Sequence, residues 1–349
     1  MAAMKKLPAF IASENELEDF LSTPSEALIE DLSAVDGDIM ILGAGGKMGP
    51  SMAKLAMRAV REGGLKKKVY AVNRSFREEH LRKQMEELGI QIVKCDFLED
   101  GALEKLPECQ NIIFLAGMKF GSSEAQAQLW ALNCLMPGLV ARRFRSSRIV
   151  ELSSGNIYGL NNLLHGGPVD GDDLKPFGDY AMSVLGRDRM FEYAAETYKT
   201  PVCLLRLFYA LDLRYGIIVD VAQKILSGTP IDVTMGNLTC IWQGDANSQT
   251  LRALKLCSAP AKPLIVTGPE TVSIRWMAKR LSEELGKEAI LTGIESTDII
   301  MGNSAQATRL FGYPTVPLDQ VIIWVAHWLK NGGPTLGKPT KFQVRDGKF

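Results

Sequence analysis

The feature that most constrains the fold is a glycine-rich stretch that directly follows a short apolar run. Residues 39–42 are all apolar, and residues 51–60 place apolar side chains at helical spacing. The seven residues 43–49 lie between them, and they include Gly43, Gly46 and Gly49. The stretch therefore predicts a buried strand, a tight turn and a helix. Glycines three apart in such a turn let a pyrophosphate approach the backbone at the positive end of the helix. We call residues 43–49 the glycine turn and expect it to bind a dinucleotide; the alternative is an ordinary strand-to-helix turn.

A second strand is predicted at residues 68–72, and it ends where a dinucleotide-binding unit contacts the adenosine ribose. NAD enzymes of this shape usually carry Asp or Glu there, which accepts hydrogen bonds from the ribose 2′-hydroxyl and repels a 2′-phosphate. This chain has Asn73 followed by Arg74, which removes the repulsion and adds a cation that can pair with phosphate. NADP is therefore favoured over NAD, although an arginine can also stack on adenine. Lys47 in the glycine turn either adds charge near the phosphates or points to solvent.

Composition and charge argue against several classes of protein. The formal net charge is zero, and 46% of the residues are apolar, which is typical of soluble globular proteins. Nucleic acid is therefore not an expected partner. No apolar run is long enough to cross a bilayer and no signal peptide is evident, so no membrane partner is expected. The six cysteines are scattered, which fits a cytoplasmic location, and no group of Cys and His suggests a metal site.

Predicted strands and helices alternate through the first two thirds of the chain. Further strands are expected at residues 90–95, 111–115, 148–152 and 202–207, with helices at 77–87, 123–143 and 180–196. Shorter units follow, with helices at 217–227, 247–257, 274–285 and 317–329 and extended segments at 231–233 and 264–266. This order predicts an α/β fold: a Rossmann-type doubly wound parallel sheet with a smaller C-terminal α+β substrate lobe.

Four parts of the chain are expected from this order of elements. A helical N-terminal extension covers residues 1–37, with Ser25 as the N-cap of its second helix. A dinucleotide-binding domain covers residues 38–210. A small substrate-binding lobe, interleaved with that domain, covers residues 211–330. Residues 331–349, rich in Gly, Pro and Lys, form a C-terminal surface arm.

Motifs at the ends of the predicted strands give a more specific interpretation. They are Asp96, Phe114-Leu115-Ala116-Gly117-Met118-Lys119, Asn133 and Ser153-Ser154-Gly155-Asn156-Ile157-Tyr158-Gly159. With the glycine turn, they make residues 38–330 resemble the extended short-chain dehydrogenases/reductases, the group that contains nucleotide-sugar epimerases and dehydratases. The resemblance implies a catalytic role for Ser154 and a supporting role for Asn133. It implies cofactor contacts at Gly43, Gly46, Lys47, Met48, Gly49, Asn73, Arg74, Asp96, Leu115, Ala116, Gly117, Lys119, Asn133, Tyr180 and Phe208.

One departure from the family pattern concerns the active-site tyrosine. The family places a lysine four residues after that tyrosine, whereas here Tyr180 is followed by Val184. In the family the lysine lowers the tyrosine pKa; a tyrosine near its reference pKa of about 10 is ionised at only roughly one part in a thousand at pH 7. Three explanations stay open. Arg187, on the same helical face, substitutes for the lysine; Tyr180 acts only as a hydrogen-bond donor; or the protein binds a dinucleotide without catalysis.

The substrate is expected to be smaller than a nucleotide sugar. The family's diphosphate-binding arginine lies seven residues before an aspartate that matches Asp245, and here Leu238 occupies its place. A buried diphosphate without a cation would be poorly compensated. Substrate contacts are expected at Ser154, Asn156, Tyr209, Trp242 and Gln243. Trp242 is equally compatible with a packed core residue, and His165 is a further candidate acid or base.

The sequence thus predicts an NAD(P)-dependent oxidoreductase or epimerase acting on a small sugar-like or sugar-acid substrate, with Ser154, Tyr180 and Arg187 as candidate catalytic residues. One alternative is a non-catalytic, redox-sensing dinucleotide-binding protein, and another is a nucleotide-sugar epimerase or dehydratase. The resemblance also implies a homodimer.

Overall fold

A seven-stranded parallel sheet forms the centre of the computed structural model, which describes residues 7–76, 79–119 and 124–348. Its strands are β1 (Ile39–Leu42), β2 (Val69–Asn73), β3 (Gln91–Lys94), β4 (Asn111–Phe114), β5 (Arg148–Ser154), β7 (Val202–Leu207) and β12 (Lys262–Val266). Their order is β12-β7-β5-β4-β1-β2-β3, and every neighbouring pair is parallel. The strand order reverses between β1 and β4, which is where ligands bind in sheets of this kind. The predicted Rossmann-type fold is confirmed.

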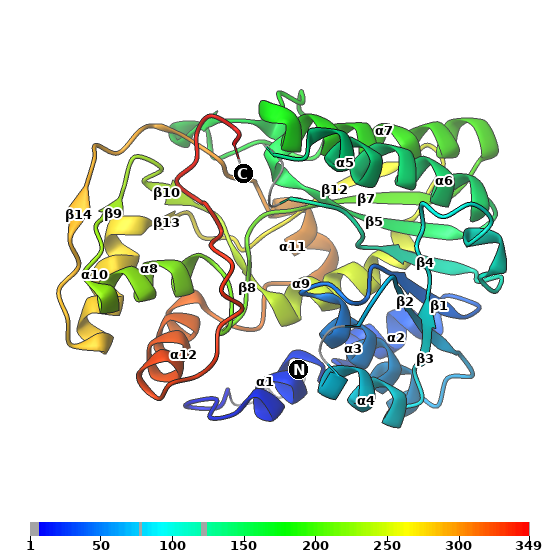
Figure 1. The fold of residues 1–349 in the computed structure, drawn as a ribbon, viewed down its shortest axis with the longest axis horizontal. Helices are drawn as coiled ribbons and strands as arrows, with labels where there is room; N and C mark the ends of the chain where they lie inside the picture. Colours follow the sequence, from blue (N-terminus) through cyan, green and yellow to red (C-terminus); the bar gives the residue numbers. More distant parts are fainter. Residues whose placement is uncertain (1–6, 77–78, 120–123, 349) are drawn as a thin grey trace.

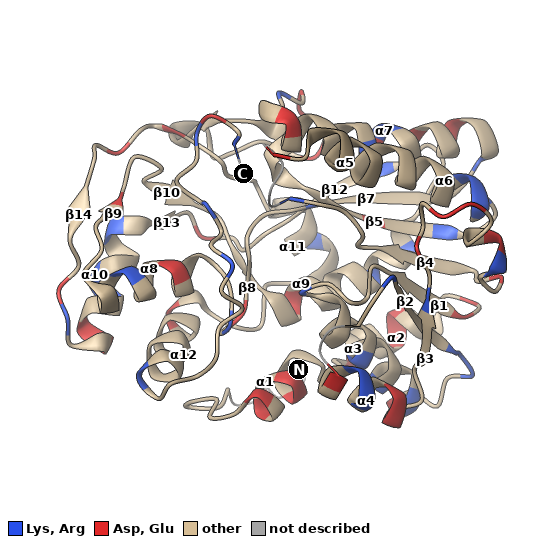
Figure 2. Ribbon diagram, viewed as in Figure 1, with Lys and Arg blue, Asp and Glu red and all other residues tan. Residues whose placement is uncertain are grey.

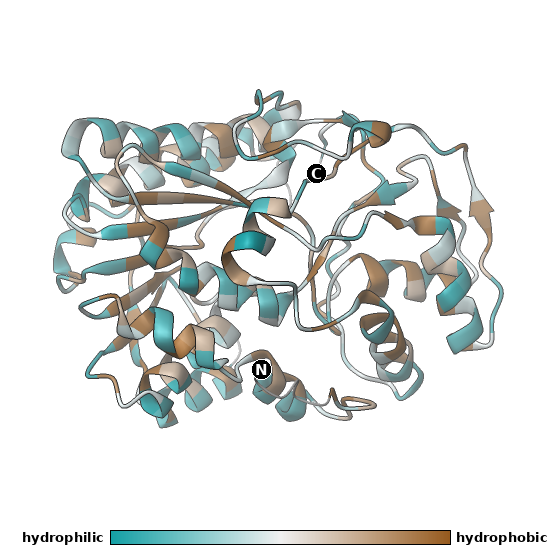
Figure 3. Cartoon of the chain, turned by 180° about the vertical axis from the view of Figure 1, so that it is seen from behind, coloured by the Kyte–Doolittle hydropathy of each residue, from teal (hydrophilic) through white to brown (hydrophobic). Residues whose placement is uncertain are grey.

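Helices cover both faces of the sheet because successive side chains of each strand point to opposite sides. Ile39 and Ile41 of β1 belong to one apolar cluster, and Met40 and Leu42 belong to another. The first cluster includes residues of α2 (Glu26–Ser33), α3 (Gly49–Glu62) and α9 (Gln243–Arg252). The second includes residues of α6 (Met136–Arg143) and α7 (Gly178–Tyr198). Figure 1 shows α6 and α7 on the opposite side of the sheet from α2 and α3, and Figure 3 shows the apolar strands between these layers.

One predicted helix is interrupted. Instead of a continuous helix over residues 123–143, the described residues form α5 (Gln126–Trp130), a π-helical turn (Ala131–Leu135) and α6. Pro137 lies at the start of α6, where it cannot donate the backbone hydrogen bond that a continuous α-helix requires. Residue 123 lies outside the described residues. So do residues 77 and 78 of another predicted helix, which is observed as α4 (Glu79–Glu87).

The smaller lobe packs α8 (Ile217–Ser227), α10 (Ile274–Leu285) and α12 (Leu318–Lys330) around one apolar cluster. Helix α1 (Glu14–Leu21) contributes Leu17 and Leu21 to the same cluster. Short strand pairs complete the lobe and its junctions: β6 (Asn161–Asn162) with β15 (Asp298–Ile299), β8 (Ala210–Leu211) with β11 (Ile241–Trp242), β9 (Ile231–Asp232) with β14 (Leu291–Thr292), and β10 (Asn237–Leu238) with β13 (Val272–Ser273). Strand β12 comes from this part of the sequence but belongs to the large sheet, and α11 (Ala305–Phe311) packs near it.

Short 3₁₀ helices form at Leu103–Lys105, Gly155–Tyr158, Leu163–His165 and Ala253–Leu256. Figure 2 shows basic and acidic residues on the surface helices, and on α4 Arg82 pairs with Glu79 and Glu86. Within the described residues, no helix is both long enough and apolar enough to span a membrane. The same residues contain no group of three or more His, Cys, Asp or Glu side chains that could hold a metal ion.

Candidate functional site

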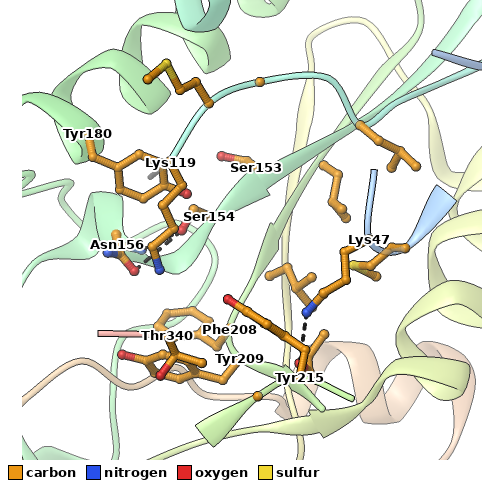
Figure 4. A pocket seen from close by; sticks show the side chains of 18 of the residues that line it. Lys47, Lys119, Ser153, Ser154, Asn156, Tyr180, Phe208, Tyr209, Tyr215 and Thr340 are labelled. Carbon is orange, nitrogen blue, oxygen red and sulfur yellow. Dashed lines mark hydrogen bonds between the residues drawn. The ribbon is translucent and has the colours of Figure 1, made fainter. Parts of the chain in front are cut away.

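A cavity of about 250 Å³ lies between the sheet and the smaller lobe, beside the carboxyl ends of β1, β4 and β5. Figure 4 shows the side chains that converge on it. It is lined by Lys47, Met48, Leu115, Gly117, Met118, Lys119, Leu152, Ser153, Ser154, Asn156, Tyr180, Arg187, Leu207, Phe208, Tyr209, Ala210, Tyr215, Gly216, Ile217 and Thr340. Many of the sequence-predicted site residues are therefore brought together.

The glycine turn packs too closely against its neighbours to carry side chains at two positions. Gly43 has φ +92°, and a Cβ there would lie 2.6 Å from the backbone nitrogen of Ala116. A Cβ on Gly49 would lie 2.3 Å from the carbonyl oxygen of Ala44. Helix α3 begins here without a side-chain cap and without an acidic residue in its first turn. Its positive end is open to an anion, and Gly46 is exposed beside it, so these residues fit the pyrophosphate of a dinucleotide.

The predicted adenosine end of the site lies at the ends of β2 and β3. Asn73 bonds to the carbonyl of Ser75 and packs against Gly45. The Arg74 side chain is 67% exposed, and its Nη1 atom lies 3.8 Å from Oδ2 of Asp96. Arg74 is thus free to turn toward a ligand phosphate, because an exposed ion pair at this distance is weak.

Ser154 and Tyr180 both line the cavity. Ser154 ends β5, and Tyr180 lies in the first turn of α7, so two separate elements position the two hydroxyl groups. Burial raises the pKa of Tyr180 above its usual value, while the Arg187 charge and the Ser154 hydroxyl oppose that rise. Asn156 turns back to the same serine, with its backbone nitrogen 3.3 Å from Ser154 Oγ.

Arg187 reaches the cavity from one turn beyond Val184. Its Nη1 atom donates to the carbonyl of Leu152 at 3.1 Å, and its Nη2 atom donates to Asn133 Oδ1 at 2.8 Å. Gly117 makes room for the guanidinium, because a Cβ there would lie 2.2 Å from Nη2. The buried carboxylate of Glu151 lies 3.7 Å from Nη1. Arg187 is therefore held firmly at the site rather than exposed on the surface.

Asn133 supports the site from behind and does not line the cavity. Its side chain accepts a hydrogen bond from the Met118 nitrogen and donates to the Met118 oxygen, both at 2.9 Å. It also donates to Ser183 Oγ at 3.0 Å. With its bond to Arg187, Asn133 joins the loop after β4 to α7. The resemblance implied cofactor contacts for Asn133 and Ala116, and neither is among the residues that line the cavity.

Two lysines also face the cavity. Lys47 donates to the carbonyl of Ala210 at 3.3 Å and lies 3.7 Å from the centroid of the Tyr215 ring. Burial lowers the pKa of Lys47 to about 7 and that of Lys119 to about 8. Lys119 lies 5.5 Å from the centroid of the Tyr180 ring. The sequence left the direction of the Lys47 side chain open, and in the structure this side chain points toward the smaller lobe.

Aromatic side chains form the opposite wall (Figure 4). Phe208 packs over Gly155, where a Cβ would lie 2.2 Å from the Phe208 ring, and Tyr209 lies beside it with φ +20°. Tyr215 and Thr340 were missed from the sequence. Tyr215 has a weak signal, the Tyr-Gly pair before α8, whereas Thr340 comes from the predicted surface arm and has none.

Three residues that were expected to contact the substrate or to act on it as an acid or base do not line the cavity. Trp242 is 3% exposed and packs edge-on against Trp324, with ring centroids 5.5 Å apart. Gln243 is fully buried and donates to Ser51 and Asp212. His165 is exposed on its loop. The surroundings of Trp242 therefore fit a packed core residue, because an apolar ring gains most from burial in a packed cluster.

Comparisons with known proteins give a consistent result. The family model described as the NAD dependent epimerase/dehydratase family matches residues 39–238. A search of curated proteins finds no match. Among solved structures, UDP-glucuronic acid 4-epimerase from Bacillus cereus in complex with NAD has a TM-score of 0.71 and 16% identity, over 85% of this chain and 99% of that chain.

Two further solved structures have a similar fold. MoeE5 in complex with UDP-glucose and NAD has a TM-score of 0.68 and 16% identity, over 85% of this chain and 99% of that chain. A UDP-galactose 4-epimerase has a TM-score of 0.66 and 18% identity, over 84% of this chain and 99% of that chain. At these identities the likeness concerns the fold, whereas the family model spans more than half of the sequence. The chain belongs to the NAD dependent epimerase/dehydratase family.

Proposed function

We propose that this protein is an NAD(P)-dependent oxidoreductase or epimerase that acts on a small sugar-like or sugar-acid substrate. The observation that carries the proposal is that Ser154 and Tyr180 line one cavity, which Lys47 and Met48 of the glycine turn also line. Similar solved structures contain NAD, which supports a nicotinamide dinucleotide as the cofactor. When bound, the nicotinamide would supply hydride transfer to or from a substrate carbon.

The chain's own residues supply binding and proton transfer. In this proposal, Tyr180 exchanges a proton with the reacting substrate oxygen, and Ser154 holds that oxygen in line by a hydrogen bond. Arg187 supplies a fixed positive charge whose effect lowers the pKa of Tyr180, against the larger effect of burial. It thereby takes part of the role that the family gives to a lysine.

The charges at the cavity favour a sugar acid over a neutral sugar. Its lining residues include Lys47, Lys119 and Arg187, and no Asp or Glu is among them. A carboxylate on the substrate would gain charge-assisted hydrogen bonds from such donors. Because the lysine pKa values are lowered to about 7 and about 8, both ammonium groups are retained only on the acidic side of neutrality.

A nucleotide-sugar epimerase or dehydratase is the second candidate, since similar solved structures hold UDP-sugars. The chain lacks a cation at the position of the family's diphosphate-binding arginine: Leu238 lies there, in β10, and is 1% exposed. A non-catalytic dinucleotide-binding protein is a third candidate, because Val184 replaces the family's lysine.

The first experiment is a fluorescence titration of the purified protein with NADH and NADPH. We expect binding of at least one, with NADPH favoured because Arg74 is free to pair with a 2′-phosphate. An Arg74→Ala change should then weaken NADPH binding while NADH binding stays the same. Failure of both cofactors to bind would remove the proposed function.

The second experiment measures hydride transfer with a panel of sugars, sugar acids and UDP-sugars. Tyr180→Phe should lower kcat roughly 10²–10⁴-fold with cofactor affinity preserved, because it removes only the transferable proton. Tyr313→Phe, at a 75% exposed tyrosine that does not line the cavity, is the control and should be silent. Cofactor binding without any hydride transfer would favour the non-catalytic candidate. Turnover confined to UDP-sugars would favour a nucleotide-sugar epimerase or dehydratase.

A further inference from the structure

The C-terminal arm, residues 331–348, is built into the wall of the cavity. It follows α12 and rises along the smaller lobe toward the start of α7 (red in Figure 1). It contains no helix or strand. Thr340 is 2% exposed and lines the cavity, and both its backbone nitrogen and its hydroxyl donate to Asp220 of α8. Two residues later, Phe342 is buried in the core of the lobe.

The end of the arm is anchored on the other side of the cavity. Arg345 Nη1 donates to the carbonyl of Asp298 at 2.6 Å. Gly347 packs directly on Gly178, the first residue of α7, where a Cβ would lie 2.6 Å from the Gly347 oxygen. Tyr180 follows two residues later. The arm therefore connects α8 of the smaller lobe to the helix that carries the proposed catalytic tyrosine.

The arm thus limits a cavity that is already small. Its volume of about 250 Å³ is below the range of roughly 300–1,000 Å³ that is usual for ligand pockets, and the nicotinamide ring must share it with the substrate. Figure 4 places Thr340 beside Phe208 and Tyr209, across the cavity from Tyr180. A substrate that extends beyond this wall would have to displace the segment around Thr340.

We propose that the C-terminal arm sets the upper size limit of the substrate: it admits a single unactivated sugar or sugar acid and excludes a nucleotide-activated one. This inference rests on the proposed function, because it concerns the substrate end of the same cavity. Thr340 is the specificity-determining residue of the arm. Asp220 is a positioning residue, since its carboxylate fixes Thr340 through two hydrogen bonds.

Three variants test the proposal. An opened variant ends at Phe342 and carries Thr340→Gly, so it loses the Thr340 side chain and the contacts to Asp298 and Gly178 but keeps the buried phenylalanine. A filled variant, Thr340→Trp, places an indole in the cavity. Thr335→Trp makes the same change elsewhere on the arm, at a residue that does not line the cavity, and is the matched control.

Two measurements compare these variants with the unmodified chain, each with its tighter-binding reduced cofactor bound. The first is the quenching of nicotinamide fluorescence by acrylamide, and the second is the affinity for UDP-glucuronic acid. The opened variant should show at least a twofold larger quenching constant and at least a tenfold higher affinity for UDP-glucuronic acid. The filled variant should show at least a twofold smaller quenching constant, and the control should change neither.

The outcomes separate the two proposals. If no variant binds NADH or NADPH, the proposed function fails, and the inference fails with it. If the cofactor binds, unchanged quenching in the opened variant overturns the size limit. Equal affinities of the unmodified chain and the opened variant for UDP-glucuronic acid also overturn it, and so does the absence of UDP-glucuronic acid binding to both. If the opened variant does not fold, unchanged quenching in Thr340→Trp overturns the proposal alone.

Discussion

At the scale of single residues, we propose that Arg187 supplies the positive charge that the family resemblance assigns to a lysine at position 184. Val184, at the position of the family's lysine, is fully buried and packs in an apolar cluster with Tyr158, Tyr180 and Phe208. A lysine there would have to bury its charge in that cluster, which is costly without a partner. Arg187 instead reaches the cavity beside Glu151, and its planar fork bridges two fixed oxygens. Arg187, which we propose as the source of this charge, is thus held by contacts with Leu152, Asn133 and Glu151.

The pH dependence of turnover tests this interpretation. Burial raises the pKa of Tyr180, Arg187 lowers it and Glu151 raises it. If Tyr180 acts as a base, the rate rises with pH as the tyrosine loses its proton. Removing Arg187 should therefore move the rise to higher pH, and removing the Glu151 charge should move it to lower pH.

A variant that loses only one of these two buried charges would leave the other unpaired, which would cost about 3–5 kcal/mol of folding stability. We therefore compare the unmodified chain with Glu151→Gln/Arg187→Gln. The effect of Arg187 on the pKa of Tyr180 is larger than that of Glu151, so the double variant should show the rise at higher pH and a lower kcat at neutral pH. Coincident profiles would mean that Arg187 has no part in catalysis.

Much of the site could be predicted at this scale, but only where a motif is local. The glycine turn follows from spacing, and Ser154 and Tyr180 follow from the family resemblance of one strand end and one helix start. Trp242 was placed at the substrate on its chemistry, yet tertiary packing puts it against Trp324. Tyr215 and Thr340 enter the cavity only because distant segments meet there, and no local pattern carries that information.

At the scale of elements, the helices with clear start signals were predicted well. Ser25 accepts from the backbone nitrogen of Leu28, and Ser273 accepts from that of Trp276, as N-caps should. The π-helical turn could not be predicted, because an inserted residue leaves the apolar periodicity almost unchanged. Its effect is functional, since the turn holds Asn133 between the loop after β4 and α7.

Helix α1 is held to the rest of the molecule by a buried ion-pair cluster, which gives a prediction about stability. Glu18 is 4% exposed and pairs with Lys54 of α3 and with Arg214, the latter at 2.8 Å. Burial lowers the pKa of Lys54, and Glu18 opposes that effect. Glu18→Ala should destabilise folding by about 3–5 kcal/mol, because it leaves the Lys54 charge buried without its partner.

Chemical denaturation measures this change, and a second variant identifies its cause. Glu18→Leu/Lys54→Met removes both charges and should recover most of the lost stability, since an apolar pair can replace a buried ion pair at little cost. Glu16→Ala, at an exposed residue of the same helix, is the control. A double variant as unstable as Glu18→Ala would show that packing, rather than the unpaired charge, is responsible.

At the scale of the whole molecule, one face is more apolar than a monomer requires. Helices α5, α6 and α7 lie side by side along one edge of the structure (Figure 1). Exposed apolar side chains of these helices and of the π-helical turn between α5 and α6 are Trp130, Leu135, Leu139, Met182 and Tyr193. Several exposed apolar residues on one layer of helices are typical of an interface between subunits. We propose that this face joins two copies of the chain, as the family resemblance implies.

The oligomeric state of a charged variant tests that proposal. Leu135 is 58% exposed and Met182 is 49% exposed, so Leu135→Asp/Met182→Asp should leave each subunit folded. Light scattering should give the mass of a dimer for the unmodified chain and of a monomer for the variant, because buried charges without partners disfavour association. Ile294→Asp, at an 88% exposed residue outside these helices, is the control and should remain dimeric.

Since α7 carries Tyr180 and the interface would hold α7 in place, the monomeric variant should also lose turnover while it still binds the dinucleotide. A monomeric mass for the unmodified chain at micromolar concentration would reject the dimer, and the apolar face would then need another partner.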